Sequence, residues 1–151
     1  METASPFGES PDQEANDAIS NAEAAVGALA DSFLEWIAED ISNARNALEN
    51  AKSRPDDNNG DLQAIFGVMH NLKGQGSSFG FNMLTHIAES LCGYIRDAEG
   101  SADEHQLKVV AAHFAAIDFV IEKNIKGDGG EIGKPLMAKL ETLKTNVPKP
   151  A

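Results

Sequence analysis

The chain has 151 residues, a formal net charge of −12 and a pI near 4.6. The length predicts one domain with a sizeable core, and the negative charge argues against binding nucleic acid or an anionic membrane surface. A single cysteine excludes an intramolecular disulfide and fits a reducing cytoplasm. No apolar run approaches the ~18 residues of a membrane span, and the acidic N-terminus lacks the basic stretch of a signal peptide.

The composition divides the chain into three parts. Residues 1–20 are acidic and contain two prolines, so we expect a disordered tail there, although the alanine-rich stretch 14–30 also suits a preceding helix. Residues 21–147 carry the apolar repeats and should form a helical bundle domain. Residues 148–151, Pro-Lys-Pro-Ala, should fray.

Apolar residues at alternating spacings of three and four predict four helices in the domain. The first follows a capping-box pattern at Ser32 and Glu35, the second is capped by Asp61, and the fourth follows another capping-box pattern at 101–104. Pro135 suits the first turn of a short fifth helix. The fold class is therefore all-α, an antiparallel up-down four-helix bundle with an additional short C-terminal helix and a flexible N-terminal tail. The four seams are Leu34, Ile37, Ile41, Ala44, Leu48 and Ala51; Leu62, Ile65, Met69, Leu72 and Gly76; Leu84, Ile87, Leu91, Ile95 and Ala98; and Leu107, Val110, Phe114, Ile117, Ile121 and Ile125.

The second predicted helix contains the stretch His70-Asn71-Leu72-Lys73-Gly74, which places His70, Lys73 and Gly74 on one face. A side chain four residues on leans back over the first residue. Because Gly74 has no side chain, His70 should stand uncovered beside the Lys73 cation. Glycine inside a helix costs about 1 kcal/mol relative to alanine, so stability alone does not explain it. An accessible imidazole beside a cation suits a group that accepts an anion and releases it again.

This motif, followed by small residues and then by Phe79-Gly80, resembles the histidine-containing phosphotransfer (HPt) domains of multistep two-component signalling. It is also similar to the phosphorylatable N-terminal domain of chemotaxis-type histidine kinases. Together with the helical pattern, the resemblance covers roughly residues 31–126. It implies that His70 is the phosphoacceptor, that Lys73 steadies the phosphoryl group and that Gly74 keeps the docking face clear.

The chain departs from the HPt pattern at Cys92. Several members of the family have a Gln or Glu about 22 positions after the histidine, where its side chain hydrogen-bonds the imidazole. A thiol is a poor acceptor and a weak donor. Either another group nearby, for instance Ser90 or Glu89, therefore orients the His70 ring, or the ring is held more loosely.

The resemblance implies receiver domains of hybrid histidine kinases and response regulators as partners. Their aspartates would exchange the phosphoryl group with His70, and the receiver would supply Mg²⁺, so no cofactor is expected in this chain. We expect a modest, transient interface because the relay must release its partner. The expected docking face comprises Phe66, His70, Lys73, Gly74 and Ser77 from the second helix with Phe81, Thr85 and Ala88 from the third.

The remaining motifs point to no other chemistry. The chain has no P-loop, Rossmann loop or kinase motif set, so it should relay a phosphoryl group and not take one from ATP by itself. The Glu-x-x-His pairs of bundle metal sites do not occur, so no metal is expected. We interpret His86 as solvated, His105 as a first-turn residue and His113 as a partly packed surface residue.

Three functions stay open. The first is a cytoplasmic, monomeric HPt protein that relays a phosphoryl group through His70 between receiver aspartates. The second is the phosphoacceptor domain of a chemotaxis-type kinase, in which an ATP-binding domain would phosphorylate His70. The third is a non-phosphorylated helical adaptor that binds a receiver domain with the same face. Replacing His70 with glutamine separates the third from the others, because an adaptor should keep its activity.

Overall fold

The computed structural model describes residues 11–98 and 100–146, which contain helices and no strand. The all-α prediction is therefore confirmed for this part of the chain. No helix in it is long and apolar enough to cross a membrane. The elements are α1 (Pro11–Lys52), α2 (Asn59–Gln75), the 3-10 turn η1 (Ser77–Phe79), α3 (Asn82–Ala98), α4 (Glu104–Glu122) and α5 (Gly130–Thr145).

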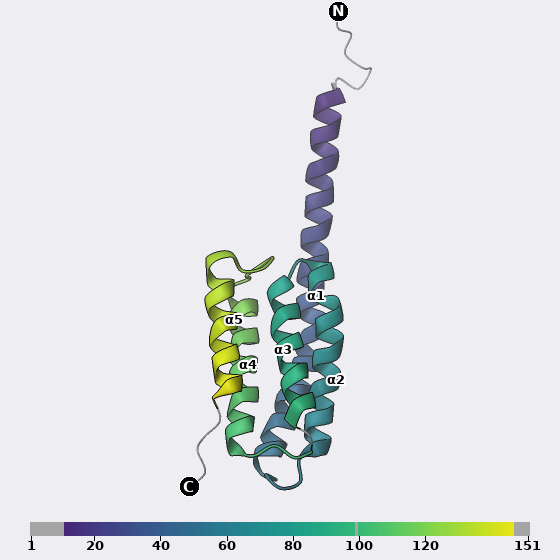
Figure 1. Ribbon diagram of the computed structural model, residues 1–151. Coiled ribbons are helices and arrows are strands. Elements are labelled where there is room, and N and C mark those ends of the chain that lie inside the picture. Colours follow the sequence, from purple (N-terminus) through teal and green to yellow (C-terminus); the bar gives the residue numbers. More distant parts are fainter. Residues whose placement is uncertain (1–10, 99, 147–151) are drawn as a thin grey trace, which may run out of the picture.

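The first four helices pack in a closed ring, in which α1 contacts α2 and α4, and α3 contacts the same two helices (Figure 1). The predicted seams supply most of the buried side chains, including Leu62, Ile65, Met69 and Leu72 of α2. Helix α5 packs on α3 and α4. The sequence periodicity therefore identifies the core correctly, because one apolar stripe per helix must face its neighbours.

Helix α1 is one continuous helix of 42 residues. The prediction of disorder over 1–20 is wrong from Pro11 onward, and residues 1–10 lie outside the described part. Ser32 and Glu35 lie inside the helix, so no capping box begins there. The helix propensity of the alanines outweighs the acidic composition. Pro11 suits the first helical position because a backbone N–H there would have no partner within the helix, and proline has none.

The N-terminal half of α1 projects beyond the other helices (Figure 1). Ala30 is buried, but most residues before it are exposed. Large apolar side chains on α1 that remain more than half exposed are Ile19, Val26, Leu29 and Trp36. The apolar stripe of this helix therefore continues past the end of the bundle without a cover from the described residues.

The starts of three further helices differ from the prediction. The N-cap of α2 is Asn58, so Asp61 lies inside that helix. Helix α4 is capped by Asp103, whose carboxylate accepts a hydrogen bond from the Gln106 backbone N–H at 2.8 Å while Gln106 Oε1 accepts from Asp103 N–H at 2.9 Å. Ser101 instead accepts a hydrogen bond from Asn58 N–H. Helix α5 begins at Gly130, whose N–H donates to Asp128 Oδ1, so Pro135 lies inside the helix and not in its first turn.

Buried Asn58 ties the α1–α2 loop to the α3–α4 loop. Its Nδ2 donates to the carbonyls of Ala51 and Ala102, and its Oδ1 accepts from Ala102 N–H at 2.7 Å. A buried amide is stable only when its donors and acceptor are satisfied. These bonds fix the ends of the helices and leave the opposite end of α2, with His70, to a separate set of contacts.

Candidate functional site

His70 lies on the outer face of α2 and is exposed, as the sequence predicts. Its imidazole lies near the Phe66 ring one turn earlier, with centroids 6.1 Å apart and an interplanar angle of 13°. No hydrogen bond to the His70 ring is formed within residues 11–98 and 100–146. Both ring nitrogens are therefore free of bonds from that part of the protein.

Gly74 lies one turn after His70 and borders open space. A Cβ added at Gly74 would meet no atom within 4 Å, whereas one added at Gly76 would lie 2.6 Å from Thr85 Oγ1 and 2.9 Å from the Phe81 carbonyl oxygen. Gly76 is therefore a packing residue that lets the end of α2 approach α3. Packing against the described residues therefore does not require a glycine at position 74.

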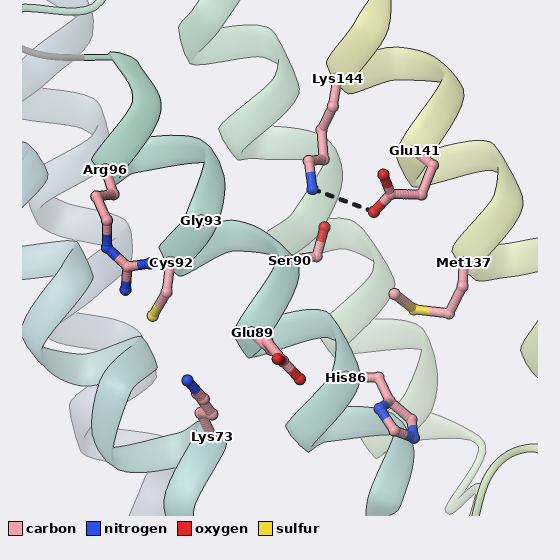
Figure 2. A pocket seen from close by; sticks show the side chains of 10 residues that line it. All are labelled: Lys73, His86, Glu89, Ser90, Cys92, Gly93, Arg96, Met137, Glu141 and Lys144. Atoms are coloured by element: carbon pink, nitrogen blue, oxygen red, sulfur yellow. Dashed lines mark hydrogen bonds and ion pairs between the residues drawn. The ribbon is translucent and has the colours of Figure 1, made fainter.

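Lys73 is half-buried and forms no ion pair with the described residues. It lines a hollow of about 490 Å³ beside the His70 face. Figure 2 shows Lys73, Cys92 and Arg96 at one end of this hollow, with Met137, Glu141 and Lys144 of α5 at the other. Lys73 therefore brings an unpaired cation close to the site.

Cys92 lies at the position for which the resemblance to HPt domains implies a hydrogen bond to the histidine. It is buried, and its Sγ donates to the Phe66 carbonyl oxygen at 3.9 Å. Burial raises the pKa of the Cys92 thiol, while the nearby Lys73 and Arg96 charges oppose that rise. The thiol is thus a neutral group that contacts the backbone of residue 66 and not the His70 ring.

Ser90 does not orient His70. Its hydroxyl lies 2.9 Å from Nε2 of His113, whose Nδ1 lies 2.8 Å from the Val109 carbonyl oxygen. His113 is fully buried, so its interpretation as a partly packed surface residue is wrong. Because a carbonyl only accepts, Nδ1 carries the proton and Nε2 accepts from Ser90. His86 is exposed, as predicted, and also lines the hollow beside Lys73.

The predicted docking face requires a correction at Phe81 and Ala88, which are fully buried and so cannot contact a partner. Phe81 precedes α3 and stacks on Phe33 of α1, with ring centroids 6.0 Å apart, and Ala88 lies on the core side of α3. Ser77 is exposed, and its N–H donates to Thr85 Oγ1 at 2.8 Å on the partly exposed side of α3.

Sequence reasoning missed Arg96, whose guanidinium carbon lies 5.7 Å from the centroid of the Phe66 ring. It follows Cys92 by four residues and therefore shares its helix face. Because α3 packs along α2, the four-residue spacing between Cys92 and Arg96 was the sequence signal that could have placed Arg96 near α2. Arg96 brings a second cation beside the His70 face.

The sequence model of the Hpt domain family matches residues 28–119, which include His70 and most of the four-helix ring. The chain belongs to the Hpt domain family. No curated protein and no solved structure matches the chain. Hpt domains are phosphocarriers of two-component phosphorelays that interact with receiver domains and are not kinases. Helix α5 lies beyond the matched residues.

Proposed function

We propose that this Hpt protein carries a phosphoryl group on His70 between the aspartates of receiver domains. The observation that carries the proposal is an exposed histidine of α2, free of hydrogen bonds from the described residues, beside a glycine that borders open space. The ring of contacts among α1, α2, α3 and α4 supports an antiparallel up-down bundle as the scaffold. The relay would act in the cytoplasm as a monomer that forms transient complexes.

The transfer step needs a neutral imidazole nitrogen with a free lone pair. That nitrogen attacks the phosphorus of a receiver aspartyl phosphate, so a P–N bond forms while the P–O bond to the carboxylate breaks. The carboxylate leaves with the electron pair of the broken bond, and the reverse reaction passes the group to the next receiver. Positioning and charge neutralisation dominate such steps. Lys73 supplies one cation, and the receiver would supply Mg²⁺.

The docking face that fits this step combines the exposed side of α2 with the bordering side of α3. Phe66 and Arg96 offer an apolar ring covered by a cation, and Ser77 and Thr85 form the other end. Gly74 between them allows the receiver to approach His70. The proposed face comprises Phe66, His70, Lys73, Gly74, Ser77, Thr85 and Arg96.

Treatment with phosphoramidate, a small-molecule phosphodonor, tests the acceptor without any partner. Intact mass and acid lability are followed for the unaltered protein, for His70→Gln and for His86→Gln, the last being a control at another exposed histidine. One acid-labile phosphoryl group that only His70→Gln abolishes supports the proposal. Folded protein that stays unmodified at His70 contradicts it and favours the adaptor.

A second arm separates the relay from a kinase fragment. The phosphorylated protein is mixed with purified receiver domains and Mg²⁺, and the loss of phosphohistidine is followed in time. A relay should pass the group to at least one receiver and take it back from that receiver's acyl phosphate. ATP alone should give no modification.

A further inference from the structure

The His70 imidazole and the Phe66 ring lie one helical turn apart and nearly parallel, with centroids 6.1 Å apart. Residues at this spacing are neighbours on a helix surface. Aromatic rings in an offset stack attract each other beyond their burial, because the edge of one faces the electron-rich face of the other. The stack leaves the edges of the imidazole, which carry both nitrogens, uncovered.

Helix α3 holds the Phe66 residue at two points. The Arg96 guanidinium lies over the ring at 5.7 Å from its centroid, which is a cation–π contact. The Cys92 thiol donates to the carbonyl oxygen of the same residue. Phe66 is partly buried, so its ring has a defined place between the two helices.

None of the side chains considered near His70 is hydrogen-bonded to its ring in the part of the chain that the structure describes. Ser90 is bonded to His113, and Cys92 is bonded to the Phe66 backbone. Glu89 lines the hollow beside Lys73. Among the described residues, the Phe66 ring is the contact that remains for the His70 ring.

We propose that Phe66 is a positioning residue for the His70 imidazole, and that stacking replaces the hydrogen bond found in other Hpt domains. The inference rests on the proposed function, because it concerns the same phosphoryl acceptor. The stack restricts rotation of the imidazole about its Cβ–Cγ bond, and a half-turn about that bond moves Nδ1 to the place of Cδ2 and Nε2 to the place of Cε1. A restricted ring presents one nitrogen to the donor, and an unrestricted ring presents both.

The test uses phosphoramidate, because a small donor does not need the docking face to which Phe66 also belongs. Phe66→Leu keeps an apolar side chain but removes the ring, and Phe66→Tyr restores it. Phe119→Leu, at a partly exposed phenylalanine of α4, is the matched control. We expect Phe66→Leu to be phosphorylated about fivefold more slowly, as loss of one aromatic contact implies, while the other two variants keep the original rate.

Phosphorus NMR supplies a readout that a merely structural role would not change. Phosphohistidine isomers at Nδ1 and Nε2 have separate signals, so the spectrum reports which nitrogen is modified. We expect one dominant isomer in the unaltered protein and in Phe66→Tyr, and a mixture in Phe66→Leu. The same rate and the same isomer ratio in a folded Phe66→Leu protein would overturn the inference.

A measurement on the unaltered protein removes any dependence on the folding of variants. Nuclear Overhauser contacts between the ring protons of Phe66 and the Cδ2 or Cε1 proton of His70 are expected, and their absence overturns the inference. Failure of the proposed function gives a different result. In that case the unaltered protein takes up no phosphoryl group at all, whatever the ring contacts show.

Discussion

Helices α2 and α4 each carry a histidine whose surroundings are opposite. His113 of α4 is fully buried, and both of its nitrogens have hydrogen-bond partners, the Val109 carbonyl and the Ser90 hydroxyl. His70 of α2 is exposed, and its contact in the described residues is the flat face of Phe66. The same type of side chain is therefore a hydrogen-bonded core group in α4 and an exposed group in α2.

The difference shows that the environment of a histidine decides its chemistry. At His113 the lone pair of Nε2 is occupied by Ser90, and burial lowers the pKa of the imidazole because the charged form loses its hydration. Such a ring is a neutral packing element. At His70 no hydrogen bond from the described residues occupies a ring nitrogen, and a Cβ added at Gly74 would meet no atom within 4 Å.

Removing each histidine in turn gives the largest expected effects. His113→Ala should lower the free energy of unfolding by about 2–4 kcal/mol, because it leaves a cavity and an unpaired Ser90 hydroxyl. The folded fraction should still accept a phosphoryl group. His70→Gln should do the reverse, with no phosphorylation and an unchanged unfolding free energy.

Urea denaturation followed by circular dichroism measures the stability of both variants, and phosphoramidate labelling measures the acceptor. The separation of roles fails if folded His113→Ala loses labelling at His70. It also fails if His70→Gln is destabilised as strongly as His113→Ala.

Two glycines of the same helix end extend the contrast between buried and exposed sites. Gly76→Ala would force a methyl group to 2.6 Å from Thr85 Oγ1 and 2.9 Å from backbone atoms of Phe81 and Thr85. Overpacking of this kind should cost about 1–3 kcal/mol. The methyl group added by Gly74→Ala would point into open space, so this substitution should instead stabilise the helix by about 0.5–1 kcal/mol. Thermal and urea denaturation should show the opposite signs, and equal effects would refute the assignment of Gly76 to packing.

The apolar seams could be predicted from the sequence because the helical period repeats over many residues. His70, Lys73 and Gly74 could be identified together because their spacing fixes them on one face of α2 whatever surrounds it. The N-terminal half of α1 could not, because its acidic composition suggested disorder while its alanines favoured a helix. Local propensity and composition gave conflicting signals there.

The errors at Phe81, Ala88 and His113 have a different cause. The first two were assigned to the docking face and the third to a partly packed surface. Phe81 stacks on Phe33 of α1, and α5 packs on both α3, which carries Ala88, and α4, which carries His113. A single sequence predicts the main apolar stripe of each helix, but it does not predict which second face of α3 and α4 is covered by α5.

Enlarging residue 74 tests whether the exposed site serves a macromolecular partner. Gly74→Leu should slow transfer from a phosphorylated receiver domain by about tenfold, equivalent to ~1.4 kcal/mol, because the side chain would lean over His70. Labelling by phosphoramidate should change far less, since a small donor needs little space. Gly67→Leu, at another α2 glycine that borders open space, is the matched control. Equal loss with both donors would mean that the substitution disturbs His70 itself.

The smallest expected effect is the pH dependence that His113 gives to stability. Its pKa is lowered in the folded protein, chiefly by burial, with Lys144 also lowering it and the Val109 carbonyl and Glu141 opposing the change. Above the ordinary histidine pKa of ~6.5, both folded and unfolded forms are neutral at this residue, so it adds no pH dependence. As the pH falls below that value, the unfolded chain binds a proton that the folded protein does not. Stability should therefore decrease, by at most ~1.4 kcal/mol per pH unit.

The contribution of His113 is isolated by comparing the unaltered protein with His113→Ala from about pH 7.5 to 5.5, a range that brackets the ordinary histidine pKa. The other charged groups are the same in both proteins, so their contributions largely cancel in the difference. The stability gap between the two should narrow toward acid, because only the unaltered protein loses the benefit of a neutral buried ring. A gap that stays constant or widens would show that His113 is protonated as readily in the fold as in the unfolded chain, and its contrast with His70 would then rest on access alone.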